Sequence, residues 1–160
     1  MIVIGGGATG VGCALDAASR GYDVLLLEQH DFGKGTSSRS TKLIHGGVRY
    51  LRQGNISLVR EALRERGLLL KNASHVVHEL PFIIPCYSKW QELFYGAGLK
   101  IYDALAGKYC MCRSRSIGKA EVIGYLPNVE SNGLKGGVLY YDAQFDDARL
   151  LIDIAVTART

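Results

Sequence analysis

Apolar and polar residues fall into short blocks at the start of the chain. Met1–Ile4 is an apolar run that meets a glycine-rich turn at residues 5–10. A short apolar run bounded by glycine predicts a buried strand. Small apolar residues then continue as a helix that Gly21 ends, and residues 22–27, mostly apolar, predict a second strand. The order strand, helix, strand predicts an α/β fold that begins with a βαβ unit.

Helix and strand patterns continue along the rest of the chain. Residues 55–73 keep one apolar face with the charged side chains of residues 60–66 opposite, which predicts a packing helix with a solvated charged face. Residues 75–84 predict a strand that runs toward Pro85, and residues 138–141 alternate too little to be half exposed, which predicts an internal strand. Further helices are predicted at residues 90–106, 116–125 and 148–158, with a loop at 127–137.

Two acidic residues, Asp146 and Asp147, precede the last predicted helix. Acidic side chains there favour the positive end of the helix dipole. The pair could also be interpreted as a carboxylate acid–base site, but the sequence shows no partner for that chemistry. Capping of the helix is therefore the preferred interpretation.

The glycine cluster at residues 5–10 has the spacing of a dinucleotide-binding turn. Gly5 lets the chain turn off the strand, Gly7 carries no side chain to block a pyrophosphate, and Gly10 lets the helix pack close to the sheet. The helix N-terminus offers N–H groups and a partial positive charge to the diphosphate. The alternative is a glycine-rich turn without a ligand.

The second predicted strand ends at Glu28, eighteen residues after Gly10. A carboxylate at this place is suited to accept hydrogen bonds from a ribose diol. It would repel a 2′-phosphate, since two anions would be forced together. The alternative for Glu28 is a solvated acid at a strand end.

Residues 35–51 contain many hydroxyl groups followed by Lys42, His45 and Arg49. The hydroxyl run cannot build a core and needs hydrogen-bond partners or water, and phosphate or ribitol oxygens could supply them. The guanidinium of Arg49 suits a phosphate dianion, and His45 could donate to a ligand or take part in proton transfer. The alternative is a solvated loop with a surface arginine and a structural histidine.

Composition narrows the function classes. The chain has 160 residues, 48% hydrophobic and 21% charged, so a folded domain is expected rather than disorder. The net charge of +4 is too small to indicate nucleic acid. No signal peptide or membrane-spanning run is evident, and four cysteines in poor zinc spacing predict reduced thiols without a metal site, in a cytosol-like compartment.

A family resemblance rests on two long blocks, residues 2–10 and 36–51. The second block reads Thr-Ser-Ser-Arg-Ser-Thr-Lys-Leu-Ile-His-Gly-Gly-Val-Arg-Tyr-Leu. Together they resemble the FAD-dependent, quinone-linked glycerol-3-phosphate dehydrogenases. Further agreement lies at residues 61–66, 102–107, 137–142 and 146–149, so the resemblance covers nearly the whole chain.

The resemblance implies a set of binding residues. FAD would contact Gly5, Gly6, Gly7, Gly10, Glu28, Thr36, Ser37, Ser38, Lys42, Leu43 and His45. Arg49 would bind the substrate phosphate, with Tyr50 beside it. His45 is the only local candidate for the proton acceptor, and the remaining substrate and FAD contacts would lie beyond residue 160.

The resemblance also implies a two-dinucleotide-fold flavoprotein, of which residues 1–160 form an incomplete oxidoreductase domain. Residues 1–51 would be the FAD-binding βαβ unit with the flavin and substrate loop, residues 52–142 an insertion of helices and strands, and residues 143–160 the start of a returning helix. The implied reaction oxidises sn-glycerol 3-phosphate to dihydroxyacetone phosphate and passes electrons to a membrane quinone. Rival readings are a related flavin oxidase of amines or amino acids and a nucleotide-binding fragment without activity.

A membrane partner follows from the same resemblance. The predicted helix at 90–106 is aromatic and flanked by lysines, which suits an anionic membrane surface, although packing on its own domain is the alternative. The implied location is cytoplasmic, peripheral on the inner face of the cytoplasmic membrane, or on the mitochondrial inner membrane in a eukaryote. No nucleic-acid partner is expected.

Overall fold

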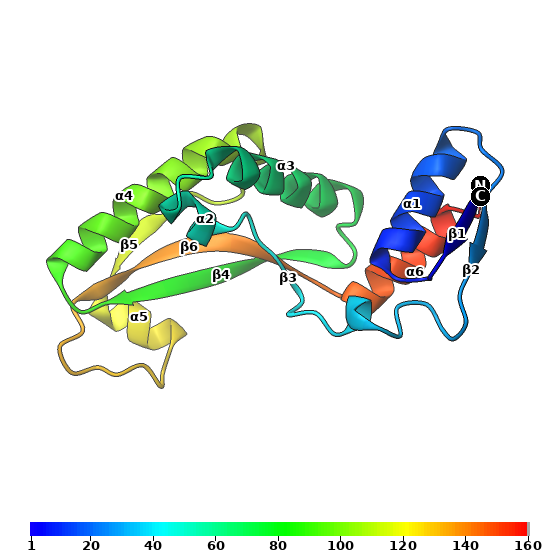
Figure 1. The fold of residues 1–160 in the computed structure, drawn as a ribbon. Helices are drawn as coiled ribbons and strands as arrows, with labels where there is room; N and C mark the ends of the chain where they lie inside the picture. Colours follow the sequence, from blue (N-terminus) through cyan, green and yellow to red (C-terminus); the bar gives the residue numbers. More distant parts are fainter. Residues whose placement is uncertain (160) are drawn as a thin grey trace. The chain divides into compact units, whose positions relative to one another are not determined.

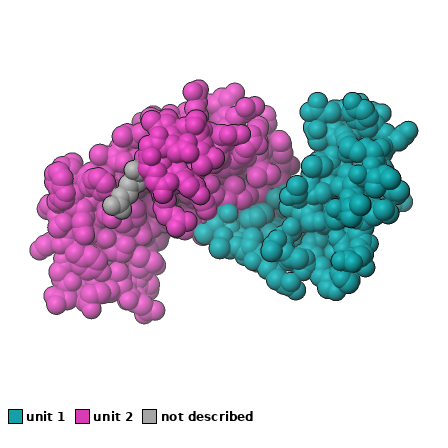
Figure 2. All heavy atoms as spheres, in the orientation of Figure 1, with its two compact units in different colours: residues 1–43, 145–160 teal, residues 44–144 magenta. Residues whose placement is uncertain are grey.

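The computed structural model describes residues 1–159, apart from the side chain of Arg52. The chain divides into two compact units (Figure 2), of which residues 1–43 with 145–160 make the first and residues 44–144 the second. Each unit has its own packed helices.

The first unit contains the βαβ arrangement predicted at the start of the chain (Figure 1). Strand β1 (Ile2–Ile4) pairs in parallel with β2 (Leu25–Leu27), and helix α1 (Ala8–Ser19) connects them. Helix α6 (Asp147–Thr157) packs along α1. The predicted α/β fold class with an N-terminal βαβ unit is confirmed.

The second strand is shorter than predicted, because it begins at Leu25 rather than at Tyr22. The amides of Gly21 and Tyr22 donate to the carbonyl oxygens of Ala18 and Ala17, and Gly21 has a left-handed φ of +82°. These bonds close the C-terminus of α1. The first residues of the predicted strand therefore belong to the helix cap.

The sheet of the longer strands has the order β3-β6-β4, and β5 also pairs with β6. Its strands are β3 (Leu43–Ile44), β4 (Val77–Cys86), β5 (Arg115–Gly118) and β6 (Gly136–Phe145). The helices of the second unit are α2 (Val48–Arg52), α3 (Ile56–Asn72), α4 (Lys89–Ala106) and α5 (Lys119–Tyr125). Short 3-10 turns are η1 (Thr36–Ser38) in the first unit and η2 (Gly107–Tyr109) in the second. Helices α3 and α4 lie along one face of the sheet (Figure 1).

Among the described residues of the second unit, two apolar clusters lie in the core. The larger one joins α3 and α4 to β4 and β6 and consists of Val59, Leu63, Cys86, Leu99, Tyr102, Ala106 and Val138. The smaller one joins α5 to β5 and β6 and consists of Ile117, Val122, Leu134 and Leu139. The larger cluster is the one on which the His45–Gly47 segment rests, since a Cβ at Gly46 would overlap Leu63 and Tyr102.

Three of the predicted helices are confirmed to within two residues, as α3, α4 and α6. The helix predicted at 116–125 is partly wrong, since Arg115–Gly118 is strand β5 and only α5 is helical. Strand β5 forms because it pairs antiparallel with β6 and buries Ile117. The paired residues of β6 lie 18 to 24 positions along the chain, beyond the reach of a local pattern.

The predicted solvated face of residues 60–66 is wrong for Arg66, which is only 2% exposed. Arg66 follows Val59 and Leu63 at helical spacing, so it lies on the buried face of α3. The other charged side chains of this run are exposed as predicted.

Within residues 1–159 no helix is long and apolar enough to span a membrane. The same residues contain no cluster of metal-ligating side chains that could hold an ion. All four cysteines are free thiols.

Candidate functional site

The glycine turn is shaped by close backbone approach. Gly5 has a φ of +108°, a conformation that favours glycine. A Cβ at Gly10 would overlap the carbonyl oxygen of Gly5, and it would lie 3.5 Å from Val3. The start of α1 therefore packs directly on the end of β1, as the sequence predicts for Gly10.

Glu28 holds the glycine turn from the end of β2. Its Oε2 accepts a hydrogen bond from the amide of Gly6 at 2.7 Å, and its Oε1 accepts one from the amide of His30 at 2.9 Å. The Gly6 amide and then the His30 amide hold the pKa of this carboxyl below its usual range. Each oxygen can accept a further bond, so the carboxylate can still receive a ribose hydroxyl.

Ser37 stands at the N-terminus of α1. Its Oγ accepts a hydrogen bond from the amide of Ala8 at 2.9 Å. Gly7 is the N-cap residue, and a Cβ there would lie 3.2 Å from the same hydroxyl. Ser37 therefore lies where the helix offers its N–H groups, which is the place predicted for a phosphate.

The rest of the hydroxyl-rich loop, residues 33–40, is held by hydrogen bonds to its own backbone and by packing on α6. Thr36 begins η1 and is exposed, and Ser38 donates to the carbonyl oxygen of Gly33 at 2.7 Å. Gly33 is buried, and a Cβ there would lie 3.3 Å from Leu151 of α6. The loop that presents Ser37 is thus packed on α6.

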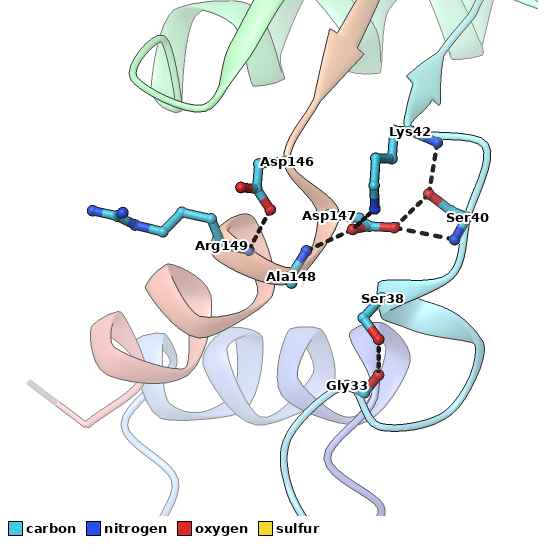
Figure 3. A network of polar contacts seen from close by, with 8 residues as sticks. All are labelled: Gly33, Ser38, Ser40, Lys42, Asp146, Asp147, Ala148 and Arg149. Atoms are coloured by element: carbon cyan, nitrogen blue, oxygen red, sulfur yellow. Dashed lines mark hydrogen bonds and ion pairs between the residues drawn. The ribbon is translucent and has the colours of Figure 1, made fainter.

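A polar network at Asp147 anchors the same loop (Figure 3). The buried Asp147 carboxylate accepts bonds from the Ser40 amide at 3.1 Å, the Ser40 hydroxyl at 2.8 Å and the Lys42 ammonium at 2.5 Å. Its Oδ1 also accepts from the Ala148 amide at 2.8 Å. Lys42, followed by Ser40, holds the pKa of Asp147 well below its usual range.

The two acidic residues before α6 have different roles. Asp146 is the N-cap residue and accepts from the amide of Arg149 at 2.9 Å, as predicted. Asp147 instead turns to Ser40 and Lys42 (Figure 3). This role of Asp147 is not evident from the sequence, because its partners lie more than a hundred residues away along the chain. Lys42, predicted to lie along the phosphates, has its ammonium group on Asp147.

The second unit holds the predicted substrate residues. The exposed His45 accepts a hydrogen bond at Nδ1 from the amide of Gly47 at 3.1 Å. Gly47 has a φ of +70° and is the N-cap residue of α2, which carries Arg49 and Tyr50. The structure thus joins His45 and Arg49 through one tight turn, while Leu43 is half-buried in β3.

Arg49 is exposed and lines a cavity of about 570 Å³ between α2 and α4. The other lining residues are almost all apolar and include Leu51, Ile84 and Trp90. No ion pair to Arg49 occurs among the residues that the structure describes. Its guanidinium is therefore available to an anion. The neighbouring Tyr50 covers Gly47, since a Cβ at that glycine would lie 2.6 Å from the ring.

The first unit fits a dinucleotide cofactor in its own geometry. The N-cap of α1 carries no side chain, Gly10 admits the helix against the strand, and Glu28 is fixed at the turn. The predicted cofactor residues from Gly5 to Leu43 lie in this unit. The predicted residues His45, Arg49 and Tyr50 lie in the second unit.

Comparison with known proteins agrees with this geometry. The family model described as FAD dependent oxidoreductase matches residues 1–160. The chain is 47% identical over 165 residues to the protein from Rattus norvegicus named glycerol-3-phosphate dehydrogenase, mitochondrial, covering 99% of this chain and 23% of the relative. It therefore spans about a quarter of the length of the curated relatives it matches.

Two solved structures share the fold. The glycerol-3-phosphate dehydrogenase from Bacillus halodurans complexed with FAD is 32% identical, with a TM-score of 0.66 over 99% of this chain and 24% of that one. The L-proline dehydrogenase from P. horikoshii is 20% identical, with a TM-score of 0.69 over 99% of this chain and 41% of that one, and shows the fold alone. The family model matches the whole chain, and the glycine turn held by Glu28 agrees with it. The chain therefore belongs to the FAD dependent oxidoreductase family.

Proposed function

We propose that this chain supplies part of the FAD site and the substrate-phosphate site of an enzyme that oxidises sn-glycerol 3-phosphate to dihydroxyacetone phosphate. The observation that carries the proposal is Arg49, an exposed guanidinium at the border of a cavity and one tight turn from His45. The relatives named glycerol-3-phosphate dehydrogenase support it. The activity is proposed for the full-length protein that includes these residues.

The first unit would hold the cofactor. The turn at Gly5–Gly10 and the N-terminus of α1 would receive the pyrophosphate, and Glu28 the adenosine ribose. Thr36, Ser37, Ser38, Lys42 and Leu43 complete the contacts proposed for this unit. When bound, the flavin supplies the two-electron oxidant for the carbinol carbon.

The second unit would hold the substrate. A guanidinium can bind two oxygens of a phosphate dianion side by side, which fixes the orientation of the substrate as well as its affinity. Arg49 would therefore place the carbinol for oxidation, with Tyr50 beside it. His45 is exposed on the same turn, and because its Nδ1 accepts from the Gly47 amide, the neutral ring carries its proton on Nε2 and is proposed to donate a hydrogen bond to the substrate.

A substitution of Arg49 separates this proposal from its main rival. A flavin oxidase of amines or amino acids needs no phosphate-binding guanidinium. In the full-length FAD-loaded protein we expect Arg49→Ala to raise the KM for glycerol 3-phosphate about 10- to 100-fold, because charge-assisted bonds to the phosphate are lost. The KM of Arg49→Lys should lie between those of the wild type and Arg49→Ala, since lysine keeps the positive charge but lacks the planar guanidinium group.

The measurement is reduction of the flavin absorption band by glycerol 3-phosphate, with glycerol and amino acids as comparison substrates. Arg60→Ala is the matched control, as Arg60 is an exposed arginine on α3. Flavin reduction by an amino acid, or equal KM values for wild type and Arg49→Ala, would refute the proposal. Absence of bound flavin in the full-length protein would refute the proposed cofactor site.

We further propose that the enzyme passes its electrons to a membrane quinone, peripheral on the inner mitochondrial or cytoplasmic membrane. Helix α4 carries an exposed apolar stripe at Trp90, Leu93, Phe94 and Ile101, which also forms one wall of the cavity beside Arg49. Its opposite face packs into the core through Leu99, Tyr102 and Ala106. The helix therefore packs on its own unit and keeps a second apolar face open, which suits insertion at the level of lipid headgroups. The name of the rat relative includes the word mitochondrial, in agreement with this location.

A further inference from the structure

Three polar side chains, Arg66, Tyr102 and Asp142, form a buried triad in the second unit. They come from α3, α4 and β6, and each is at most 3% exposed. Arg66 Nη1 donates to Asp142 Oδ1 at 2.5 Å, and the hydroxyl of Tyr102 donates to the same oxygen at 2.9 Å. The guanidinium also lies over the Tyr102 ring, 5.7 Å from its centroid.

The triad reaches the turn that carries the proposed substrate residues. The amide of Gly46 donates to the Tyr102 hydroxyl at 2.8 Å and lies 3.3 Å from Asp142 Oδ1. A Cβ at Gly46 would overlap Tyr102 and Leu63, so the backbone rests directly on the triad. The position of Gly46 is therefore set by a hydrogen bond and by packing at once.

Burial makes this arrangement costly wherever a polar atom is left without a hydrogen bond. An ion pair in a core often contributes no more stability than apolar side chains of equal volume. Arg66 Nε finds no acceptor among the described residues. Burial, followed by the charge of Asp142, raises the pKa of the Tyr102 phenol. Tyr102 therefore keeps its proton, which it needs to donate to Asp142 while accepting from Gly46.

We propose that Tyr102 and Asp142 are positioning residues for substrate binding, acting through the Gly46 backbone. Gly46 lies between His45 and Gly47, and Gly47 both donates to His45 and caps the helix that carries Arg49. A displaced Gly46 moves the imidazole and the guanidinium together. The inference rests on the proposed function, since it assigns these two side chains to the substrate.

The experiment uses the FAD-loaded full-length protein and a cycle of two substitutions, Tyr102→Phe and Arg49→Ala. We expect Tyr102→Phe to raise the KM for glycerol 3-phosphate about tenfold and to lower kcat, with the Kd for FAD unchanged. The tyrosine change should have little further effect on KM once Arg49 is alanine, because both act on the same contact. Tyr140→Phe is the control, a half-buried ring stacked on Phe82.

The inference would be overturned if the rise in KM of the double variant equalled the product of the rises in the two single variants, or if Tyr102→Phe left KM unchanged. Either result would leave the proposed function standing. A KM unchanged by Arg49→Ala would count against the proposed function itself. Asp142→Asn provides the second variant if Tyr102→Phe does not fold. It keeps the shape of the side chain and removes its charge, and it should raise KM in the same way without weakening FAD binding.

Discussion

Single glycines decide the geometry of the cofactor turn. Gly10 and Gly12 both lie in α1, two residues apart, yet a Cβ at Gly10 would overlap the Gly5 carbonyl while a Cβ at Gly12 would have nothing within 4 Å. The sequence predicts a packing role for Gly10, in the glycine cluster at residues 5–10, and none for Gly12. The two positions differ because α1 packs on the end of β1 at Gly10 and not at Gly12.

Gly10→Ala is therefore expected to destabilise the protein by about 3 kcal/mol and to weaken FAD binding, since the helix N-terminus must move away from the strand. Gly12→Ala should instead stabilise the protein by about 0.5–1 kcal/mol, as alanine is the better helix former. Urea unfolding of both variants measures the difference. Equal stabilities would show that the Gly10–Gly5 approach is not needed.

Residues with distant partners set the limit of what the sequence predicts. Gly5, Gly10 and Glu28 have their partners within the βαβ unit, and the sequence predicts the turn at Gly5, the packing at Gly10 and the place of Glu28 at the end of the second strand, but not the bond from the Gly6 amide to Glu28. Asp147 and Arg66 meet partners on other elements, and neither was assigned its contact. A charged residue in phase with an apolar stripe, as Arg66 is with Leu63, is the one sequence signal that could have revealed a buried partner.

At the scale of helices and strands, the same division between local and distant partners holds. Helices α3, α4 and α6 follow from their periodicity, and Asn55, Ser88 and Asp146 cap them with side-chain bonds. Strands β3 and β5 are too short for any pattern and form because β6 offers them a partner. The sequence therefore predicts the elements that stabilise themselves and misses those that a neighbouring strand induces.

The start of α6 gives a prediction on pH. Asp147 has a lowered pKa in the folded state, so its pairing with Lys42 contributes stability above about pH 4, and this contribution is lost as the pH falls further. The variant Asp147→Asn should be less stable than wild type at pH 7, with the gap narrowing toward pH 3. Asp146→Asn is the control, because asparagine is as good an N-cap as aspartate. Urea unfolding at the two pH values measures both, and a gap that stays constant would contradict the assignment.

At the scale of the whole molecule, one face of the β1–β2 pair stays open. Val3 faces α1, so Ile2 and Ile4 point the other way, level with Leu25 and Leu27 on the neighbouring strand. All four are exposed, Ile4 to 86%. Parallel sheets of this class are usually covered on both faces. Cofactor binding by this unit is therefore best measured in the full-length protein.

The second exposed apolar region, the stripe on α4, leads to the prediction on membranes. Trp90 is 72% exposed and Phe94 54%, and they lie one helical turn apart on the outward face. Replacing both by serine should lower the fraction of full-length protein that floats with anionic vesicles, because aromatic side chains at the headgroup level supply much of the binding energy. The double change Tyr125→Ser and Leu126→Ser removes exposed apolar area from the end of α5 and should leave flotation as in wild type.

Equal flotation of all three proteins would contradict a membrane role for α4 and leave its apolar face to a protein partner. A loss of flotation only with the α4 changes, together with slower reduction of a quinone in the same vesicles and unchanged reduction of a soluble dye, would link this face to the electron acceptor.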